Sequence, residues 1–378
     1  MNKIIYFTTA QDIDSYPDFL KKWTVFPNLS NQNFHNKLIR ALSLTHEMEV
    51  ISVRPINKNF KGKLLPYKEV KEKNITWKYI LVKQSRVDKL LNLGRRINKA
   101  LDKNEEGSVV LVDVLNLSLL RKACKVAKRL TAKIYGICTD NPLNISFTSE
   151  SYNEKLLKLI HSLDGYICLT EKINELLNVN NKPYVLIDGI SEDMIIDVPV
   201  EVEGDYIFFG GSLMKEYGIL SLVDAFEKLN KKKLKLVIAG HHENQEFLDY
   251  IKDKQNVVYV GPLDYKSVIS YEKDAICCVN PRPINPKIDD YSIPSKVLEY
   301  LSVGSITISV ENKLLKERYG DAIVWAKSGD SDDLCLALKK ALKLSENEKH
   351  ELFVAAVSLT QKYTSFKTVC NLIDKALF

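Results

Sequence analysis

Runs of strand character alternate with runs of helical character along almost the whole chain, and no other feature restricts the fold as strongly. In the first half, β-branched and aromatic runs predict strands at 3–9, 49–53, 75–82, 108–114, 133–139, 165–169 and 184–187. Helical periodicity lies between them at 31–47, 87–101, 117–130, 152–162 and 171–178. Such alternation predicts a parallel sheet that is covered by helices on both faces.

A second alternating set follows the segment Asp188-Gly189-Ile190. Its strands are predicted at 206–209, 235–239, 257–260, 275–279, 305–310 and 322–325, and its helices at 217–230, 243–252, 265–271, 294–303 and 332–344. Two more helical patterns, at 346–359 and 365–377, end the chain. A chain of 378 residues is long for one hydrophobic core. We therefore predict an α/β protein with two doubly wound, Rossmann-like domains at 1–188 and 189–364.

The composition is that of a folded soluble protein, with 45% hydrophobic and 27% charged residues. No apolar run approaches the roughly 20 residues of a membrane-spanning helix, and the N-terminus becomes polar too soon for a signal peptide. The seven cysteines form no C-x-x-C pair, so we expect reduced core residues rather than a metal or redox site. These features predict a cytoplasmic protein.

Basic residues are concentrated in the first half of the chain. Residues 1–188 hold 30 Lys and Arg against 19 Asp and Glu, a net charge of +11, whereas the remainder has a net charge of −5. Most of the excess lies in 51–103, with 15 basic residues against four acidic ones. Anionic lipid headgroups attract such a segment, although a merely solvated lysine-rich face is an equally good interpretation. No zinc-finger, RNP or helix-turn-helix signature supports nucleic-acid binding.

The stretch 280–304 combines a proline-rich loop with a helix start. The helix is expected to begin at about Pro294, because proline suits the first helical position, with Ser292 or Ser295 as its cap. Gly304 should close its last turn. The free N–H groups of a helix start attract anions such as phosphate.

Two charged side chains follow on that helix. Lys296 adds a cation in the first turn, and Glu299 lies on the same face. A cation for phosphate beside a carboxylate for ribose hydroxyls suits a nucleotide-sugar site. The alternative is an ordinary amphipathic helix with a surface Lys–Glu pair.

Glycines follow three of the predicted strands of the second half. Open parallel sheets bind ligands beyond the carboxyl ends of their strands, so these turns are candidate contacts. Lys215 could reach a phosphate there. The candidates are Gly210, Gly211, Ser212, Gly240, His241, Gly261, Pro262 and Leu263.

Several other motifs are weak or missing. Gly210-Gly211 does not open the G-x-G-x-x-G pattern of NAD-binding proteins. His241-His242-Glu243 lacks a third ligand at useful spacing, and Asp12-Ile13-Asp14 comes too early for the D-x-D motif of metal-dependent transferases. No G-x-S-x-G elbow supports a hydrolase. We therefore expect no metal site.

Several stretches in order carry a resemblance to a known family. In the second half they are YIFFGGSLMKEYGILSLVDAFEKL, LKLVIAGHHE, NVVYVGPLDYKSV and AICCVNPRP followed by YSIPSKVLEYLSVGSITIS; in the first half they are PNLSNQNFHNKLIRAL, VVLVDVLNLSLL, YGICTDNP and GYICLTEKINELLN. The sequence resembles the GT-B glycosyltransferases of retaining family 4, in the branch of capsule and exopolysaccharide assembly. The resemblance implies two Rossmann-like domains facing a cleft, with the activated sugar on the second domain and the acceptor on the first. It also implies that no metal is required and that the helix at 365–378 packs back on the first domain.

The resemblance assigns roles to single residues. Glu299 matches the second glutamate of the family's E-x7-E signature, which holds the ribose hydroxyls, and Lys296 falls beside the diphosphate. Gly261 to Leu263 would lie by the base and Gly211 by the phosphates. The remaining donor-binding candidates in the loop before the helix are Asp290, Tyr291, Ser292, Ile293, Pro294 and Ser295.

Three positions depart from the family pattern. Tyr291 replaces the first glutamate of the signature, and Ser212 and Tyr217 replace an arginine and a lysine of the glycine loop. We hypothesise that Arg282 and Lys215 supply the missing charge, and that Asp289 or Asp290 takes over a contact to the donor hydroxyls.

Acceptor-side candidates come from strand ends in the first half. Asp140 and Asp113 would face the cleft and could orient an acceptor hydroxyl, but a strand-end aspartate that caps the next helix is an equal alternative. Asn33 and His35 on the helix at 31–47 are further candidates. Catalysis would be mostly electrostatic, by helix N–H groups, Lys296, Arg282 and Lys215 at the departing diphosphate.

The predicted function is sugar transfer from a UDP-linked donor to a glycan on a membrane lipid carrier, with retention, in cell-surface polysaccharide synthesis. The basic stretch 51–103 would hold the first domain on the inner face of the plasma membrane. One alternative is a UDP-sugar 2-epimerase, which shares the architecture. The other is a non-catalytic GT-B partner of an active transferase, because the first glutamate, the arginine and the lysine of the family are missing.

Overall fold

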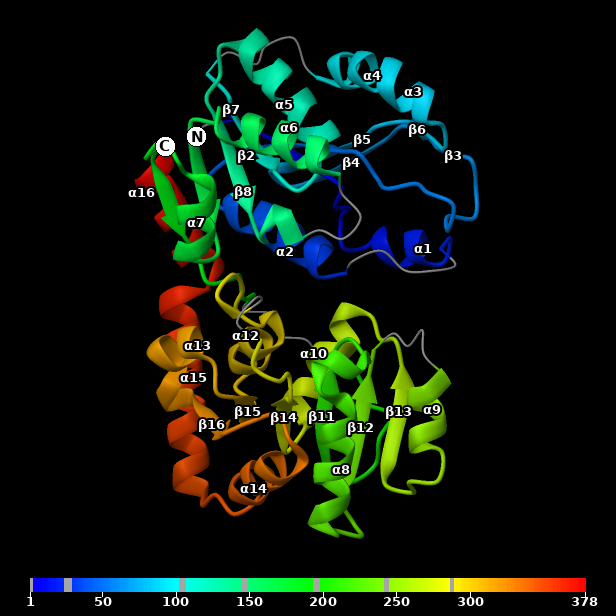
Figure 1. Ribbon diagram of the computed structural model, residues 1–378, viewed down its shortest axis with the longest axis vertical. Coiled ribbons are helices and arrows are strands. Elements are labelled where there is room, and N and C mark those ends of the chain that lie inside the picture. Colours follow the sequence, from blue (N-terminus) through cyan, green and yellow to red (C-terminus); the bar gives the residue numbers. More distant parts are fainter. Residues whose placement is uncertain are drawn as a thin grey trace. The chain divides into compact units, whose positions relative to one another are not determined.

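A computed structural model describes residues 3–23, 29–101, 107–144, 149–192, 198–240, 245–285 and 289–378 (Figure 1). The chain forms two compact units. Unit 1 comprises Met1–Ile190 together with Phe366–Phe378, and unit 2 comprises Ser191–Ser365. His241, one of the predicted donor contacts, lies outside the described residues.

Unit 1 is built on an eight-stranded sheet of order β10-β9-β8-β7-β1-β2-β5-β4. Its strands are β1 (Lys3–Thr8), β2 (Glu47–Ser52), β4 (Lys68–Glu72), β5 (Ile75–Tyr79), β7 (Val109–Asp113), β8 (Ile134–Cys138), β9 (Gly165–Cys168) and β10 (Tyr184–Leu186). All neighbours are parallel except β4, which runs antiparallel to β5 at the edge. A short antiparallel pair, β3 (Leu64–Leu65) and β6 (Val82–Lys83), lies outside this sheet.

The helices of unit 1 bury their apolar faces against this sheet. α2 (Leu29–Leu42) and the C-terminal α16 (Phe366–Leu377) share a hydrophobic core with β1, β2 and β5. α5 (Leu117–Leu130) packs on β7 and on α6 (Glu150–Ile160). The smaller helices are α1 (Tyr16–Leu20), α3 (Arg86–Leu91), α4 (Leu93–Ala100), the 3-10 turn Pro142–Asn144 and α7 (Glu171–Leu177).

Unit 2 is built on a six-stranded, fully parallel sheet of order β13-β12-β11-β14-β15-β16. Its strands are β11 (Tyr206–Gly210), β12 (Lys235–Ala239), β13 (Val257–Gly261), β14 (Cys277–Asn280), β15 (Thr307–Val310) and β16 (Ile323–Ala326). α8 (Ile219–Leu229) and α14 (Ser331–Ala341) pack together on one face (Figure 1), and Tyr271 of α10 (Tyr265–Asp274) and Tyr300 of α12 (Ser295–Ser302) belong to the core of the other. α9 (Gln245–Ile251), α13 (Lys313–Tyr319), α15 (Glu346–Tyr363) and the 3-10 turns Lys215–Tyr217 and Gly320–Ala322 complete the unit.

The chain passes from one unit to the other twice, after Ile190 and after Ser365, and hydrogen bonds link the two segments. The backbone N–H of Ser191 donates to the carbonyl of Thr364 at 2.8 Å, and the two hydroxyls lie 2.8 Å apart. α15 ends just before this point, and α16 then packs beside α2 and β10 in unit 1.

The predicted α/β class with parallel sheets is confirmed, and several local predictions are wrong. The single helix expected at 87–101 is two helices that meet at Asn92, whose side chain donates to Asp88 Oδ1 at 3.0 Å. The strand expected at 75–82 ends at Tyr79. β4 was not predicted, because its sequence KEVKE lacks the apolar character of an interior strand. Among the described residues, no helix combines the length and hydrophobicity needed to cross a membrane.

Candidate functional site

The strand order of unit 2 reverses between β11 and β14, and ligands bind at such switch points in open α/β sheets. The carboxyl ends of these two strands are Gly210 and Asn280. The N–H of Gly210 donates to the hydroxyl of Tyr300 at 3.4 Å, which links the glycine turn to α12. Burial raises the pKa of Tyr300 well above its usual value, so this hydroxyl stays neutral.

Glycine is required where the turns of this edge touch. The N–H of Gly211 donates to the Ala239 carbonyl and that of Gly240 to the Gly261 carbonyl, each at 3.0 Å. Gly240 has φ +151°, and a Cβ there would lie 1.9 Å from the carbonyl oxygen of Gly211. Gly261 also has a positive φ, +78°, but a Cβ there would meet nothing within 4 Å, so only its backbone conformation favours glycine.

Helix α12 begins one residue later than predicted. Pro294 has an extended ψ of 108° and is the N-cap, which makes Ser295 the first helical residue and rules it out as the cap. The predicted end is confirmed, because Gly304 has φ +73° and its N–H donates to the Leu301 carbonyl at 3.1 Å. The start of α12 thus follows the switch point. Pro294 has no side-chain acceptor, so its side chain does not cap the first N–H groups of the helix.

Lys296 and Glu299 are brought together on α12, and a third charged residue joins them. Lys296 Nζ lies 2.8 Å from Glu299 Oε2 and 3.9 Å from Oε1 of Glu272 on α10. Glu272 is fully buried and Glu299 nearly so. Sequence reasoning missed Glu272, although a glutamate on the inward face of an amphipathic helix was a signal for it.

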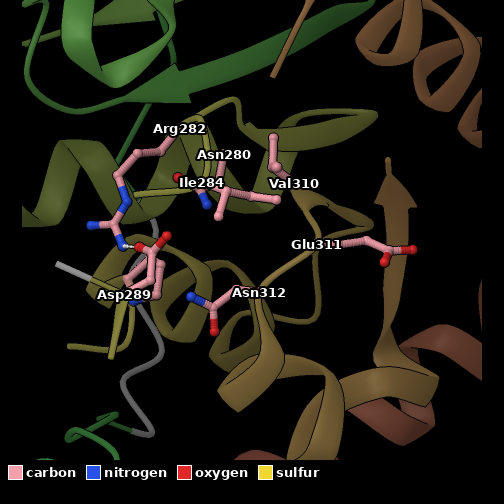
Figure 2. A pocket seen from close by; sticks show the side chains of 8 residues that line it. Asn280, Arg282, Ile284, Asp289, Val310, Glu311 and Asn312 are labelled. Atoms are coloured by element: carbon pink, nitrogen blue, oxygen red, sulfur yellow. Dashed lines mark hydrogen bonds and ion pairs between the residues drawn. The ribbon is translucent and has the colours of Figure 1, made fainter. Parts of the chain in front are cut away.

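The loop after β14 contains a second ion pair, between Arg282 and Asp289 (Figure 2). Asp289 Oδ2 also accepts from the N–H of Asn285 at 2.6 Å. Asn280 Nδ2 donates to Ser309 Oγ at 3.0 Å. A shallow pocket here is lined by Asn280, Arg282, Ile284, Asp289, Pro294, Val310, Glu311 and Asn312.

The remaining predicted donor residues differ in exposure. Ser212, Lys215, Pro262, Asp290 and Ser295 are exposed, whereas Gly211, Gly261, Leu263, Tyr291 and Ser292 are half-buried and Gly210, Ile293 and Pro294 are buried. Lys215 lies in the 3-10 turn after β11. Because Arg282 is paired with Asp289, the hypothesis that Arg282 supplies positive charge to the donor requires that this ion pair opens.

In unit 1 the strand order reverses between β1 and β7, and two predicted residues, His35 and Asp113, meet there with Tyr6. The Tyr6 hydroxyl lies 2.6 Å from His35 Nδ1. His35 Nε2 lies 3.4 Å from Asp113 Oδ2, to which Asn31 also donates at 3.3 Å. Tyr6, His35 and Asp113 are buried. Asp113 does not cap the next helix, because Asn116 caps α5.

Two aspartates of this edge have shifted pKa values. Burial raises the pKa of Asp113, but the charge and hydrogen bond of His35, with the Leu115 N–H and Asn31, outweigh it and leave the pKa below its usual value. Asp140 follows β8 and is exposed as a residue, yet neighbouring atoms crowd its carboxyl. This desolvation and the charge of Asp113 raise the pKa of Asp140. Asn33 is half-buried on α2.

Asp12 of the D-x-D sequence has a structural role. Its carboxylate accepts from the Tyr79 hydroxyl and, at 2.7 Å, from the Ser15 N–H. Gln32 of α2 exchanges two hydrogen bonds, of 2.8 and 2.7 Å, with the backbone of Gln11. These contacts fix the loop that leaves β1 at the switch point.

Residues 204–344, which lie within unit 2, match the family profile described as glycosyl transferases group 1. The whole chain also matches solved structures of GT-B glycosyltransferases, which have two Rossmann-like domains. The chain is a glycosyltransferase of the GT-B fold. No curated protein matches its sequence.

Three of the solved structures illustrate how far the likeness extends. Sucrose-phosphate synthase from Thermosynechococcus elongatus has a TM-score of 0.70 at 10% identity, over 99% of this glycosyltransferase and 98% of that chain. HepE from Anabaena, in complex with UDP and glucose, has a TM-score of 0.64 at 9% identity over 99% of each chain. A glycosyltransferase from Rickettsia africae has a TM-score of 0.66 at 11% identity, over 98% and 96%. These likenesses establish the fold.

Proposed function

We propose that this glycosyltransferase moves a hexosyl-type sugar from a UDP-linked donor to a glycan or lipid-linked acceptor, with retention, in the synthesis of a cell-surface polysaccharide. The match of residues 204–344 to the glycosyl transferases group 1 carries the proposal. Its support in the structure is the glycine-rich edge at the switch point of unit 2, followed by α12 with Glu299. HepE, a structural neighbour, was solved with UDP and with UDP-glucose.

At the donor site, each group would act by position and charge. Glu299 would accept hydrogen bonds from the ribose hydroxyls, and the N–H groups at the start of α12 would face the diphosphate. The exposed Lys215 and the Arg282 guanidinium, once released from Asp289, would stabilise the charge that develops on the leaving phosphate. We propose that no metal is required.

At the acceptor site, Asp140 would orient the acceptor hydroxyl. Asp140 follows β8 and is exposed as a residue, while Asp113, at the end of β7, and His35 are buried. The departing phosphate would take the proton of the acceptor hydroxyl, in keeping with retention.

We further propose that unit 1 rests on the cytoplasmic face of the plasma membrane through 51–103. Two apolar side chains of α3, Val87 and Leu91, are 67% and 63% exposed. Leu64 of β3 is also exposed and pairs with Lys83 of β6. Exposed apolar residues among lysines are typical of surfaces that enter the interface of an anionic membrane.

A second candidate is a non-catalytic partner of an active transferase. Arg282 and Lys296 are both engaged with carboxylates, and Ser212, Tyr217 and Tyr291 stand where the family has charged residues. So little available positive charge at the phosphate site favours a non-catalytic role. A UDP-sugar 2-epimerase would be distinguished by its product, a free epimer instead of a glycoside.

The test is calorimetric and thermal-shift titration with UDP, GDP and ADP, without and with Mg²⁺. The wild type should bind one of these nucleotides, UDP in our proposal, without metal. Glu299→Ala should weaken this binding by about tenfold or more, since hydrogen bonds to a charged group are lost. Glu227→Ala, an exposed glutamate of α8, is the matched control and should bind as the wild type does. No binding of any nucleotide would discard the donor site and put the non-catalytic partner first.

A further inference from the structure

Lys296 is held between two carboxylates that come from different helices. Its Nζ lies 2.8 Å from Glu299 Oε2 on its own helix and 3.9 Å from Glu272 Oε1 on α10. With all three groups ionised, this triad carries a net charge of −1. The charge of the lysine is therefore already balanced, so that it adds little net attraction for a phosphate.

Glu272 is the fixed end of the triad. Its side chain is fully buried, whereas that of Lys296 is 31% exposed. The backbone carbonyl of Glu272 accepts hydrogen bonds from Ser305 Oγ and, at 3.4 Å, from Cys278 Sγ of β14, so this turn of α10 is tied to the sheet. Burial of an ionised carboxylate is costly unless a cation or hydrogen bonds compensate its charge, and Lys296 is a cation within 4 Å of it.

Glu299, on the same helix as Lys296, is the other end of the triad. Its side chain is 8% exposed, and the charge-assisted hydrogen bond from Lys296 to Oε2 restricts the rotation of its carboxylate. A carboxylate that accepts from two neighbouring hydroxyls binds them more tightly when it is already held in one orientation before the ligand arrives.

We propose that Glu272 and Lys296 are positioning residues: Glu272 anchors Lys296, and Lys296 orients the Glu299 carboxylate toward the ribose hydroxyls of the donor nucleotide. This inference rests on the proposed function and replaces the expectation that Lys296 contacts the diphosphate.

The experiment compares two ligands that differ only at the ribose, UDP and 2′,3′-dideoxy-UDP, by calorimetry on the full chain. The variants are Glu272→Gln, Lys296→Met and the double variant, in which the buried Glu272 is not left as a charge without its lysine. Glu227→Gln is the matched control, and thermal unfolding verifies that each variant is folded.

The expected result is a loss of about five- to tenfold in UDP affinity for each single variant, with less than about twofold loss for dideoxy-UDP. The double variant should lose no more than the larger single loss, because Glu272 acts through Lys296. Equal losses for both ligands, or a loss for Lys296→Met that follows the phosphates and is absent with uridine, would overturn the proposal.

Failure of the proposed function looks different. If the wild type bound UDP poorly but GDP or ADP well, the matched deoxy pair of that nucleotide would replace UDP, with the same expected losses. If the wild type bound no nucleotide, the proposed function and this inference would both be overturned. A variant series without ribose dependence would overturn only the inference.

Discussion

At the scale of single residues, the buried cluster of Tyr6, His35 and Asp113 has the clearest energetic signature. The carboxylate of Asp113 is buried, yet its neighbours hold its pKa below the usual value. The unfolded chain has an Asp pKa of about 4, so Asp113 stabilises the folded protein above about pH 4. This contribution is lost as the pH falls through the lower, folded pKa.

Asp113→Asn should therefore lower the free energy of unfolding at pH 7 by about 1–3 kcal/mol, because the amide keeps the shape but not the charge beside His35. The difference between wild type and variant should be smaller at pH 3 than at pH 7, because the contribution of the Asp113 charge begins to be lost below about pH 4. Urea denaturation followed by far-UV circular dichroism at both pH values measures it. Asp321→Asn, on an exposed residue of unit 2, is the control. A difference that stays constant across this range would refute the charge argument.

At the scale of elements, the start of α8 depends on one glycine. Gly218 has φ +79°, and a Cβ there would lie 2.2 Å from the carbonyl oxygen of Pro281 in the loop after β14. Gly204 has the same φ of +79° but nothing within 4 Å of a built Cβ. The two positions thus separate backbone strain from steric collision.

Gly204→Ala should cost about 1–2 kcal/mol of stability from the left-handed backbone alone. Gly218→Ala should cost about 1–3 kcal/mol more, because backbone atoms must shift to admit the methyl group. It should also weaken nucleotide binding, since the shift displaces the loop that carries Arg282. Thermal and urea unfolding with nucleotide titration measure both effects. Equal costs for the two substitutions would show that the contact with Pro281 is not tight.

Helices and strands could be predicted where the pattern of their own residues determines them. The contacts of the site could not be predicted where the two residues come from different elements. Both sheets follow from apolar runs, and α5 has the predicted bounds, with Asn116 as its cap. The edge strand β4 has charged residues at four of five positions, so its pairing with β5 depends on the neighbouring strand and not on its own pattern.

The charged pairs of the site also could not be predicted in full from the sequence. Lys296 and Glu299 are visible as neighbours on one helix, but Glu272 meets them only through the packing of α10 on α12. Arg282 was expected to be available for phosphate, and its partner Asp289 lies across a loop whose path no sequence pattern determines. Sequence reasoning therefore located the candidate residues of the site but missed which of their charges are already balanced.

At the scale of the whole molecule, charge and exposed apolar surface coincide in the first half of the chain. Its net charge of +11 contrasts with −5 for the remainder. Leu91 of α3 and Leu336 of α14 are equally exposed, at 63%, but only Leu91 lies in the basic stretch 51–103. If basic charge and apolar contact act together at an anionic membrane, these two leucines should behave differently.

The wild type should sediment with vesicles of phosphatidylglycerol and phosphatidylcholine, bind pure phosphatidylcholine weakly, and be released by about 0.5 M salt, which screens surface charge. Leu91→Ser should weaken vesicle binding by about tenfold, because burying a leucine contributes roughly 1.5–3 kcal/mol when complete. Leu336→Ser should have no effect. Reversing Lys63 and Lys83 to Glu should abolish the preference for anionic lipid. Equal binding to both vesicle types, or equal effects of the two leucine substitutions, would remove the membrane from the proposed function and leave the acceptor to be sought among free glycans.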